Sequence, residues 1–383
     1  MTDFPVENLV ALLHDLAARP VGSQSKNDPD PLTPPLTPPL NEELRECLLQ
    51  IRVQDLTAMP GKGLAHDHIT LGYTGLLLRI PRQSQLALNA SDNLQYQAGC
   101  FARMFASGHT PACYAVLPPS EQVPMGALLV ERIAGRVPAA SADFQSIATT
   151  LASIHRLALP AKDSRAPLYD QQNSLADTLS EVRSQAAYLN QVDISSGSRG
   201  LIDAQLELAE TELKSLRAPP SRLISFDAHP GNYLIDGTGR AVLVDLEKGR
   251  YGGCGFDLAH ATLYTSTTWD TEVNIELQQS VIEKFYKTWL HEMPDDLAAS
   301  MLPTLIAMRR MMWLWSVTWC ARWRVESNAT GLSHKHPAEN TQGRVAQNRP
   351  DALVVHVEER TRHYLQEDVI NKVITEFKTL TFI

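Results

Sequence analysis

The sequence predicts an α+β protein of two lobes, a small β-rich N-lobe followed by a large, mainly helical C-lobe. Short apolar runs with the pattern of strands gather between residues 50 and 133, around one helical stretch. From residue 141 onward, apolar side chains recur almost everywhere with helical spacing. The 383 residues are enough for two such units. We expect a helix and a proline-rich arm at 1–44, the N-lobe at 45–133 and the C-lobe at 134–383.

Composition and charge exclude several classes of protein. The formal net charge of −9 argues against a nucleic-acid-binding surface, which needs a positive excess. The five cysteines are odd in number and scattered, so neither a disulfide framework nor a zinc site is expected. Asp3 and Glu7 stand where a secretory signal would carry positive charge, and the most apolar run, residues 311–320, is shorter than the ~20 residues that span a bilayer. We expect a cytoplasmic protein that does not associate with membranes.

The N-terminal segment divides into a helix and an arm. Residues 4–18 place five apolar side chains on one helical face: Phe4, Leu9, Leu12, Leu13 and Leu16. Residues 27–43 then contain six prolines and a duplicated "LTPP", which predicts an extended, exposed arm. This arm is either a plain linker or a docking peptide.

The N-lobe is predicted from five strand-like runs and a helix. "IRVQDL", "HITLGY" and "GLLLRIP" read as strands, and a helix over 94–106 ends at Ser107-Gly108. "CYAVLP" and "ALLVERI" then resume the strand pattern. These segments make a small α+β unit.

The C-lobe is predicted to be helical with one β island. The island spans 223–245, where "YLID" and "AVLVD" flank the turn "GTGR" as a β-hairpin. The helical stretches are 144–159, 172–190, 201–216, 271–290, 298–326 and 351–378.

The hairpin brings polar side chains together. Asp227 and Asn232 precede its first strand and Asp245 ends its second, so folding back at the turn makes the three converge. Oxygen ligands of this kind suit Mg²⁺, and a carboxylate that is not a ligand could accept the proton of an attacking hydroxyl. Glu247 and Asp257 add two carboxylates nearby. The alternative is that these residues only cap turns and close a strand.

The segment "SFDAHPGNYLID…AVLVDLE…GFDLAHA" resembles the catalytic segment of the aminoglycoside phosphotransferase and choline kinase-like family, small-molecule kinases of the protein-kinase-like fold. That family's loop runs His-x-Asp-(x)4-Asn, followed by a hairpin that ends in an acidic motif. "LLVERIAGR" resembles the family's hinge, "LASIHRLALP" a helix end, "GLLLRIPR" the strand with the ATP-contacting basic residue and "QAGCFARMFASGHTPA" the helix after it. The resemblance covers about residues 50–270.

The resemblance implies a role for each matched position in the C-lobe. Asp227 would be the catalytic base, or would orient the acceptor hydroxyl. Asn232 and Asp245 would hold Mg²⁺ on the ATP phosphates, and Glu247 would support a second metal. Residues that would support the loop are Ser225, His229 and Asp257.

The resemblance also implies that the N-lobe binds the nucleotide. Arg79 would contact the α- and β-phosphates, Gly61 and Gly63 belong to the loop over them, and Gln97 and Glu131 complete the nucleotide-binding set. The chain departs from the family pattern where Ser225 replaces a histidine, where Arg79 replaces a lysine, and where Gln97 replaces the glutamate that pairs with that lysine. A hydrogen bond between Gln97 and Arg79 would then replace the ion pair that the family forms between glutamate and lysine.

We therefore expect an ATP- and Mg²⁺-dependent phosphotransferase that acts on a hydroxyl of a small, amine-bearing metabolite or antibiotic. A nucleotide-binding pseudokinase with a regulatory or docking role is the alternative, and nucleotidyl transfer on the same fold is a third reading. Trp315 and Trp319 lie on one face of a C-terminal helix and could bind a cationic substrate, or could simply pack the lobe. The acceptor, the choice of ATP over GTP and the oligomeric state stay open.

Overall fold

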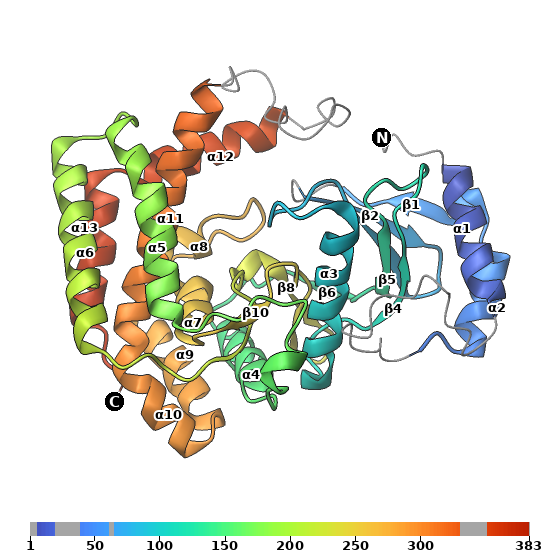
Figure 1. Ribbon diagram of the computed structural model, residues 1–383, viewed down its shortest axis with the longest axis horizontal. Coiled ribbons are helices and arrows are strands. Elements are labelled where there is room, and N and C mark those ends of the chain that lie inside the picture. The colour runs from blue at the N-terminus through green and yellow to red at the C-terminus, as the bar shows by residue number, and fades with distance from the viewer. Residues whose placement is uncertain (1–5, 20–38, 61–64, 330–350, 383) are drawn as a thin grey trace.

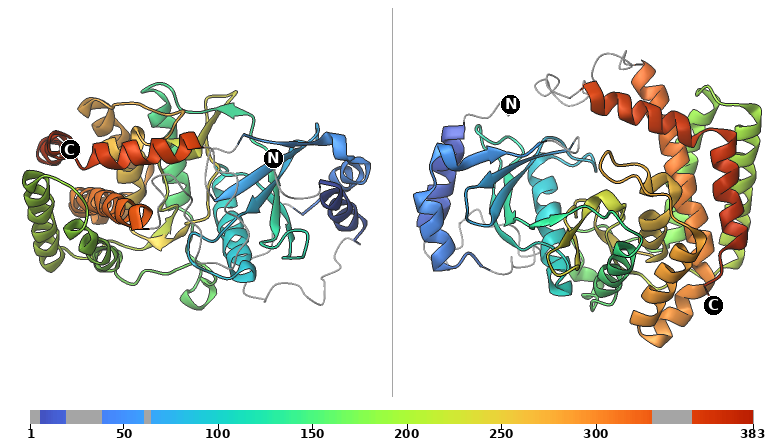
Figure 2. Two further views of the ribbon diagram at one scale, coloured as in Figure 1. Left: turned by 90° about the horizontal axis from the view of Figure 1, so that it is seen from above. Right: turned by 180° about the vertical axis from the view of Figure 1, so that it is seen from behind.

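The structure, a computed structural model, describes residues 6–19, 39–60, 65–329 and 351–382. A small lobe with an antiparallel sheet adjoins a larger lobe made mainly of helices (Figure 1). The views from above and from behind show the same division (Figure 2).

The small lobe contains a five-stranded antiparallel sheet in the order β1-β2-β3-β5-β4. Along β3 the side chains alternate, as in any strand: Leu76, Leu78 and Ile80 belong to the core on the outer face, and Leu77 and Arg79 point to the inner face. Helix α3, Ala90–Met104, packs on the inner side of the sheet. The strands are β1 Leu56–Ala58, β2 His66–Leu71, β3 Leu76–Pro81, β4 Cys113–Leu117 and β5 Ala127–Glu131.

Two N-terminal helices, α1 (Val6–Ala18) and α2 (Glu42–Gln50), cover the outer face of the sheet (Figure 1). Helix α1 confirms the amphipathic helix expected there. The extended arm was predicted to reach residue 43, but α2 begins at Glu42 because Asn41 caps it, its side-chain oxygen accepting a 2.8 Å hydrogen bond from the backbone N–H of Leu44. The rest of the proline-rich stretch, residues 27–38, lies outside the described residues.

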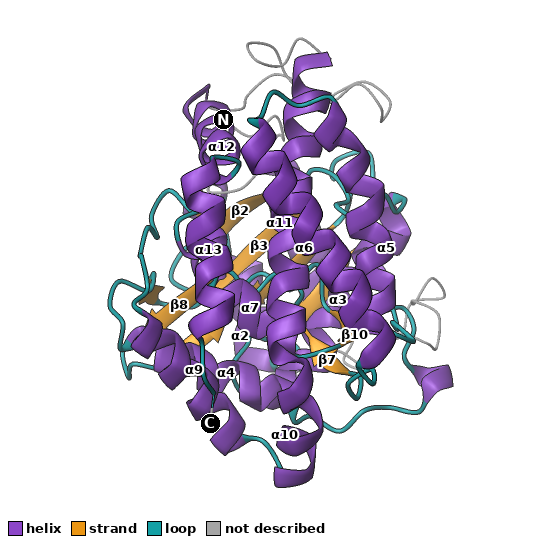
Figure 3. Cartoon of the chain, turned by 90° about the vertical axis from the view of Figure 1, so that its left-hand side faces the viewer, coloured by secondary structure: helices purple, strands orange, loops and turns teal. Residues whose placement is uncertain are grey.

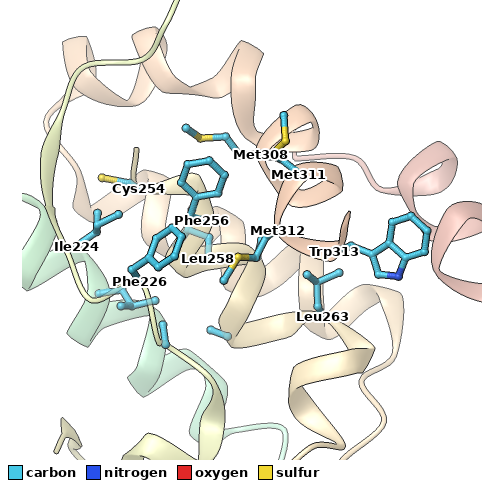
Figure 4. Close-up of a cluster of buried hydrophobic side chains, with 14 of the residues drawn as sticks. Ile224, Phe226, Cys254, Phe256, Leu258, Leu263, Met308, Met311, Met312 and Trp313 are labelled. Carbon is cyan, nitrogen blue, oxygen red and sulfur yellow. The ribbon is translucent and has the colours of Figure 1, made fainter. Parts of the chain in front are cut away.

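The large lobe is organised around the long helix α11, Leu305–Ala329, which packs against α5, α6, α7 and α12 (Figure 3). Phe226, Phe256, Met308, Met312 and Trp313 form part of its core (Figure 4). The other helices are α4 Asp143–His155, α5 Ser174–Ala186, α6 Ser196–Ser215, α7 Gly255–Thr262, α8 Tyr264–Thr267, α9 Gln279–Glu292, α10 Asp295–Met301, α12 Asp351–Tyr364 and α13 Glu367–Thr379.

The apolar run at 311–320 is explained by this central position, since α11 is covered by other helices. Among the described helices, none combines the length and the apolar character needed to cross a membrane. Three predicted helices differ from the structure. The stretch at 298–326 is not one helix, because α10 ends at Met301, a 3-10 turn spans Leu302–Thr304 and α11 begins at Leu305. The stretch at 271–290 becomes helical only at Gln279, and 351–378 is two helices, because the backbone at Gln366 is extended (ψ 142°).

The predicted β-hairpin is confirmed as β8, Tyr233–Asp236, and β9, Ala241–Leu243, with Tyr233 opposite Leu243. Gly239 in the turn has φ +84°, a conformation that glycine adopts without strain. The short strand β6, Gly135–Arg136, extends this sheet. A separate antiparallel pair joins β7, Arg222–Ile224, to β10, Arg250–Gly252.

A prediction concerns Asp143, the first residue of α4. Its carboxylate pairs with Arg136 at 2.8 Å and accepts the backbone N–H groups of Ala139 and Ala140, and the hydrogen bond from Arg136 lowers its pKa to about 2. The interactions that lower this pKa stabilise the folded state only while the carboxyl group is ionised. Asp143→Ala should therefore lower the free energy of unfolding at pH 7 by about 1–3 kcal/mol.

The difference between wild type and Asp143→Ala should shrink as the pH falls from about 4 towards 2, where the wild-type carboxyl takes up its proton. Urea unfolding at several pH values measures it, with Asp163→Ala at an exposed turn as the control. A difference at about pH 2.5 that equals the difference at about pH 7 would contradict this role.

Candidate active site

The site is built on a loop that follows β7 and is held by a buried carboxylate. Asp257, in the first turn of α7, accepts hydrogen bonds from the backbone N–H groups of Ser225 and Phe226, both at 2.7 Å. Phe226 has φ +57°, an unusual conformation for a residue with a side chain. Asp257 therefore fixes the loop in a strained backbone geometry just before Asp227.

Asp257 is itself oriented by His155 at the end of α4. The indole N–H of Trp289 donates to His155 Nδ1 at 3.0 Å, so Nδ1 must be the acceptor and Nε2 carries the proton. Nε2 then donates to the Asp257 carboxylate at 3.1 Å. This chain of hydrogen bonds joins α9, α4 and α7 beneath the loop.

Backbone hydrogen bonds place the predicted base and the predicted metal ligands together. The backbone N–H of Asp227 donates to Ser225 Oγ at 3.1 Å, so Ser225 braces the loop through its hydroxyl. The amide nitrogen of Asn232 donates to the Asp227 carbonyl at 2.8 Å, and the N–H of Val244, next to Asp245, donates to the Asn232 carbonyl at 2.9 Å. The convergence expected from the hairpin is therefore present in the structure.

The carboxylate of Asp227 faces positive and neutral nitrogen groups. Lys248 Nζ lies 2.8 Å from its Oδ2, and His260 Nδ1 lies 3.7 Å from its Oδ1. Burial by itself would raise the pKa of Asp227, but Lys248, His229 and His260 lower it below its ordinary value overall. Burial lowers the pKa of His260 to about 3. At neutral pH the group is a carboxylate beside an ammonium.

Asp245 connects the two lobes. Its Oδ1 accepts a 2.5 Å hydrogen bond from Arg79 Nη2 on β3. Burial would raise the pKa of Asp245, but Arg79 and His66 hold it well below its usual range. The site thus lies where the sheet lobe meets the helical lobe (Figure 1).

Two histidines of β2 hold the guanidinium of Arg79. His66 Nδ1 accepts from Arg79 Nη2 at 3.2 Å, and His68 Nε2 accepts from Nη1 at 3.3 Å. Since an arginine can only donate, both rings are neutral acceptors. Burial and the charge of Arg79 lower the pKa of His66, and the same two causes lower the pKa of His68 to about 4.

The sequence suggested a hydrogen bond between Gln97 and Arg79, but the two side chains do not contact each other directly. Its Oε1 lies 3.2 Å from His66 Nε2, so His66 stands between the two residues. The same Nε2 lies 3.5 Å from Glu247 Oε2, and burial together with Asp245 raises the pKa of Glu247 to about 8. Glu247 is therefore a buried neighbour of His66 as well as of Asp245.

These groups fit Mg²⁺, which takes one or two carboxylates and leaves the remaining positions to water and phosphate oxygens. The amide nitrogen of Asn232 is used in the loop, which leaves its side-chain oxygen for a cation beside Asp245. Arg79 occupies one oxygen of Asp245. In the described part of the chain, no three histidine, cysteine, aspartate or glutamate side chains cluster as a metal site, and a site of one carboxylate and one amide does not need such a cluster.

The remaining predicted residues take the following places. Glu131, at the end of β5, accepts the backbone N–H of Ala112 at 3.1 Å. The ring of His229 lies 5.8 Å from that of His260, and its carbonyl accepts the N–H of Asn232. Gly61 and Gly63, expected over the phosphates, lie outside the described residues.

Trp315 and Trp319 both pack within the helical lobe, and both are half-buried. The ring of Trp315 meets Phe226 edge to face at 6.1 Å, and its indole N–H donates to Glu181 at 2.8 Å. The ring of Trp319 meets Trp269 at 5.6 Å. Trp315 thus contacts the residue immediately before Asp227, while Trp319 lies within an aromatic cluster.

Lys248, His155 and His66 carry no assignment from the sequence, yet each contacts a predicted site residue. Lys248 directly follows Glu247, and His155 lies in the matched stretch "LASIH". His66 and His68 form the pattern "HDH" on a strand, which puts both on one face. The sequence shows these patterns, but it does not show which site residues the three side chains contact.

Comparison with known proteins shows which family model and which solved structures this chain resembles. The model of the phosphotransferase enzyme family matches residues 63–291, more than half of the chain. A comparison with curated proteins finds no significant match.

Solved structures share the fold at low sequence identity. A provisionally assigned aminoglycoside phosphotransferase of Ralstonia eutropha matches with a TM-score of 0.59 and 10% identity, over 83% of this chain and 93% of that one. A choline kinase of Cryptosporidium parvum matches with a TM-score of 0.52 and 14% identity, over 86% and 93%. An ethanolamine kinase of Plasmodium vivax matches with a TM-score of 0.52 and 11% identity, over 83% and 84%. The predicted two-lobed, protein-kinase-like fold is confirmed.

Proposed function

The chain belongs to the phosphotransferase enzyme family and is a small-molecule kinase; we propose that it transfers the γ-phosphoryl group of ATP, with Mg²⁺, to a hydroxyl of a small, amine-bearing metabolite or antibiotic. In this proposal an N-lobe at 45–133 binds the nucleotide. A C-lobe at 134–383 supplies the catalytic groups and binds the acceptor.

The observation that supports the proposal best is the hydrogen-bonded unit of Asp227, Asn232 and the end of β9. Asn232 bonds the carbonyl of Asp227 at 2.8 Å and is itself bonded by Val244, next to Asp245. A base, an amide oxygen and a carboxylate are thereby held on neighbouring backbone segments. Phosphoryl transfer depends mainly on such positioning and on charge neutralisation.

Each group then has a defined task. Asp227, kept ionised by Lys248, accepts the proton of the acceptor hydroxyl as its oxygen attacks the γ-phosphorus. Asn232 and Asp245 would hold Mg²⁺, which supplies charge neutralisation at the phosphates. Arg79, aligned by His66 and His68, points its guanidinium at the same place from the N-lobe and would bind the α- and β-phosphates.

The contact between Trp315 and Glu181 supports an amine-bearing acceptor. Trp315 lies against Phe226, next to Asp227 in the chain, and its indole N–H is bonded to the Glu181 carboxylate. A half-buried indole ring beside a carboxylate offers both cation–π attraction and charge complementarity to an ammonium group. A hydroxyl carried a short distance from that ammonium would reach Asp227.

A pseudokinase is the second candidate, and one observation favours it. Arg79 and Asp245 form a 2.5 Å ion pair, so a metal ligand of the proposed site is already engaged by a positive charge. If this pair does not yield to Mg²⁺, the protein would bind nucleotide without turnover, or not at all. The two candidates differ in whether ATP is consumed.

A substrate screen tests the proposal. ADP release from ATP is measured with Mg²⁺ over small hydroxyl compounds, each offered with an amine and as a matched compound without it. We expect release with a subset of the amines, and a product whose mass has gained a phosphate. A product that has gained AMP would indicate nucleotidyl transfer, and no release with any acceptor would favour the pseudokinase.

A further inference from the structure

Lys248 is the charged group nearest to the proposed base. Its Nζ lies 2.8 Å from Asp227 Oδ2, and only 20% of the lysine side chain and 13% of the aspartate side chain are exposed. The antiparallel pairing of β10 with β7 accounts for this, because Arg250 lies opposite Ile224. The residues just before Arg250 are thereby held beside the residues just after Ile224, which places Lys248 against the catalytic loop.

The surroundings keep this lysine charged. The carboxylate of Asp227, 2.8 Å from Nζ, compensates the charge of the ammonium. An ammonium carries three N–H donors. Among the described residues, Asp227 is the one group within hydrogen-bond distance of Nζ. A mostly buried ammonium thus has donors to spare beside the place where an acceptor hydroxyl would meet the nucleotide.

We propose that Lys248 is a further catalytic residue, which donates one hydrogen bond to Asp227 and another to the phosphoryl group during transfer. The inference rests on the proposed function, because it takes Asp227 as the base. The hydroxyl that bonds to Asp227 is also the atom that attacks the phosphorus, so oxygens of the phosphoryl group come within reach of a donor 2.8 Å from the same carboxylate.

The chemical step is balanced without any proton from the lysine. The acceptor oxygen forms a bond to the γ-phosphorus, the bond from that phosphorus to the β-γ bridging oxygen breaks, and the electron pair leaves with ADP. The hydroxyl proton passes to Asp227. Lys248 stays an ammonium and offsets negative charge on the phosphoryl oxygens and on Asp227, which would otherwise repel each other.

The test compares nucleotide complexes that differ only at the position of the transferred group. Calorimetry measures the affinity of MgADP and of MgADP with aluminium fluoride, which imitates the phosphoryl group in transfer. In Lys248→Met we expect the aluminium fluoride complex to weaken by roughly 10²-fold and MgADP to change by less than about threefold. Lys248→Arg, which keeps the charge, should recover part of the loss. Lys372→Met, which removes the lysine of another ion pair, on α13, is the control and should change neither.

A second arm separates phosphoryl contact from mere support of Asp227. In an Asp227→Asn background, Lys248→Met should still weaken the aluminium fluoride complex roughly tenfold or more. No further loss in that background would overturn the inference, since Lys248 would then act only through Asp227. Faster ADP release in Lys248→Met would also overturn it, because the ion pair would then be an inhibitory latch.

The outcomes distinguish this inference from the proposed function. A wild-type protein that binds neither MgADP nor its aluminium fluoride complex would overturn both. Normal wild-type binding together with unchanged binding in Lys248→Met would overturn the role of Lys248 alone. If Lys248→Met does not fold, as judged by circular dichroism, Lys248→Gln carries the same comparison with a polar side chain of similar length.

Discussion

Asp227→Asn should lower acceptor-dependent ADP release by roughly 10²–10⁴-fold and leave the affinity for MgATP within about threefold of wild type. Asparagine has nearly the shape of aspartate and can still accept a hydrogen bond from Lys248, so the loop should stay in place. It cannot take up the proton of the attacking hydroxyl. The loss should therefore appear in kcat and not in nucleotide binding, measured by ADP release and by calorimetry.

Asp203→Asn provides a matched control for this change. Asp203 lies on α6 and forms an ion pair with Arg199 on the same helix, outside the site. Its replacement should leave turnover unchanged. Wild-type turnover in Asp227→Asn would contradict the assignment of Asp227 as the base.

Asp257→Ala should destabilise the folded protein by about 3–5 kcal/mol, because it leaves several buried donors without an acceptor. Asp257 is fully buried and accepts hydrogen bonds from the backbone of Ser225 and Phe226 and from His155. The backbone of Phe226, with φ +57°, would lose the contacts that hold it in a strained conformation. Urea unfolding measures the loss of free energy.

The same variant should also lose turnover under conditions where it remains folded, since the loop that carries Asp227 relaxes. Asp163→Ala, at an exposed turn, is the stability control. A free energy of unfolding within about 1 kcal/mol of wild type would contradict the role of Asp257 in bracing the loop.

The hairpin and its three polar residues could be predicted because the information is local. The turn "GTGR" between two apolar runs fixes the register of β8 and β9, and this register determines that Asp245 returns towards Asn232. No knowledge of distant packing is needed. For the same reason α1, α4 and strands β2 to β5 were predicted near their observed positions. The strand expected for "IRVQDL" (51–56) was wrong, because Val53–Asp55 form a 3-10 turn and β1 begins only at Leu56.

Contacts between the lobes could not be predicted in this way. Arg79 and Asp245 are 166 positions apart in the chain, and their pairing depends on how the sheet packs on the helical lobe. Gln97 was matched to Arg79 from the family pattern, but His66 on β2 lies between them. A histidine at that position changes the partner of both residues, and the pattern of α3 alone carries no sign of it.

The pairing of Lys248 with Asp227 was missed for a related reason. The register of β7 and β10 determines it, and both strands have only three residues, too few for a recognisable alternation. The role of Trp315 also depended on tertiary structure. Helical spacing placed it on a face of α11, but its contact with Phe226 follows from how α11 packs under the loop.

Calorimetric titration of ATP, with and without Mg²⁺, into the wild-type protein and Asp245→Asn tests whether the junction of the lobes is a metal-dependent nucleotide site. The wild type should bind ATP at least roughly tenfold more tightly with Mg²⁺ (about 1.4 kcal/mol) than without it. Asp245→Asn should lose most of that difference, because it removes the carboxylate that would hold the metal. ATP affinity that is the same with and without Mg²⁺ in the wild type, or no binding at all, would contradict the assignment.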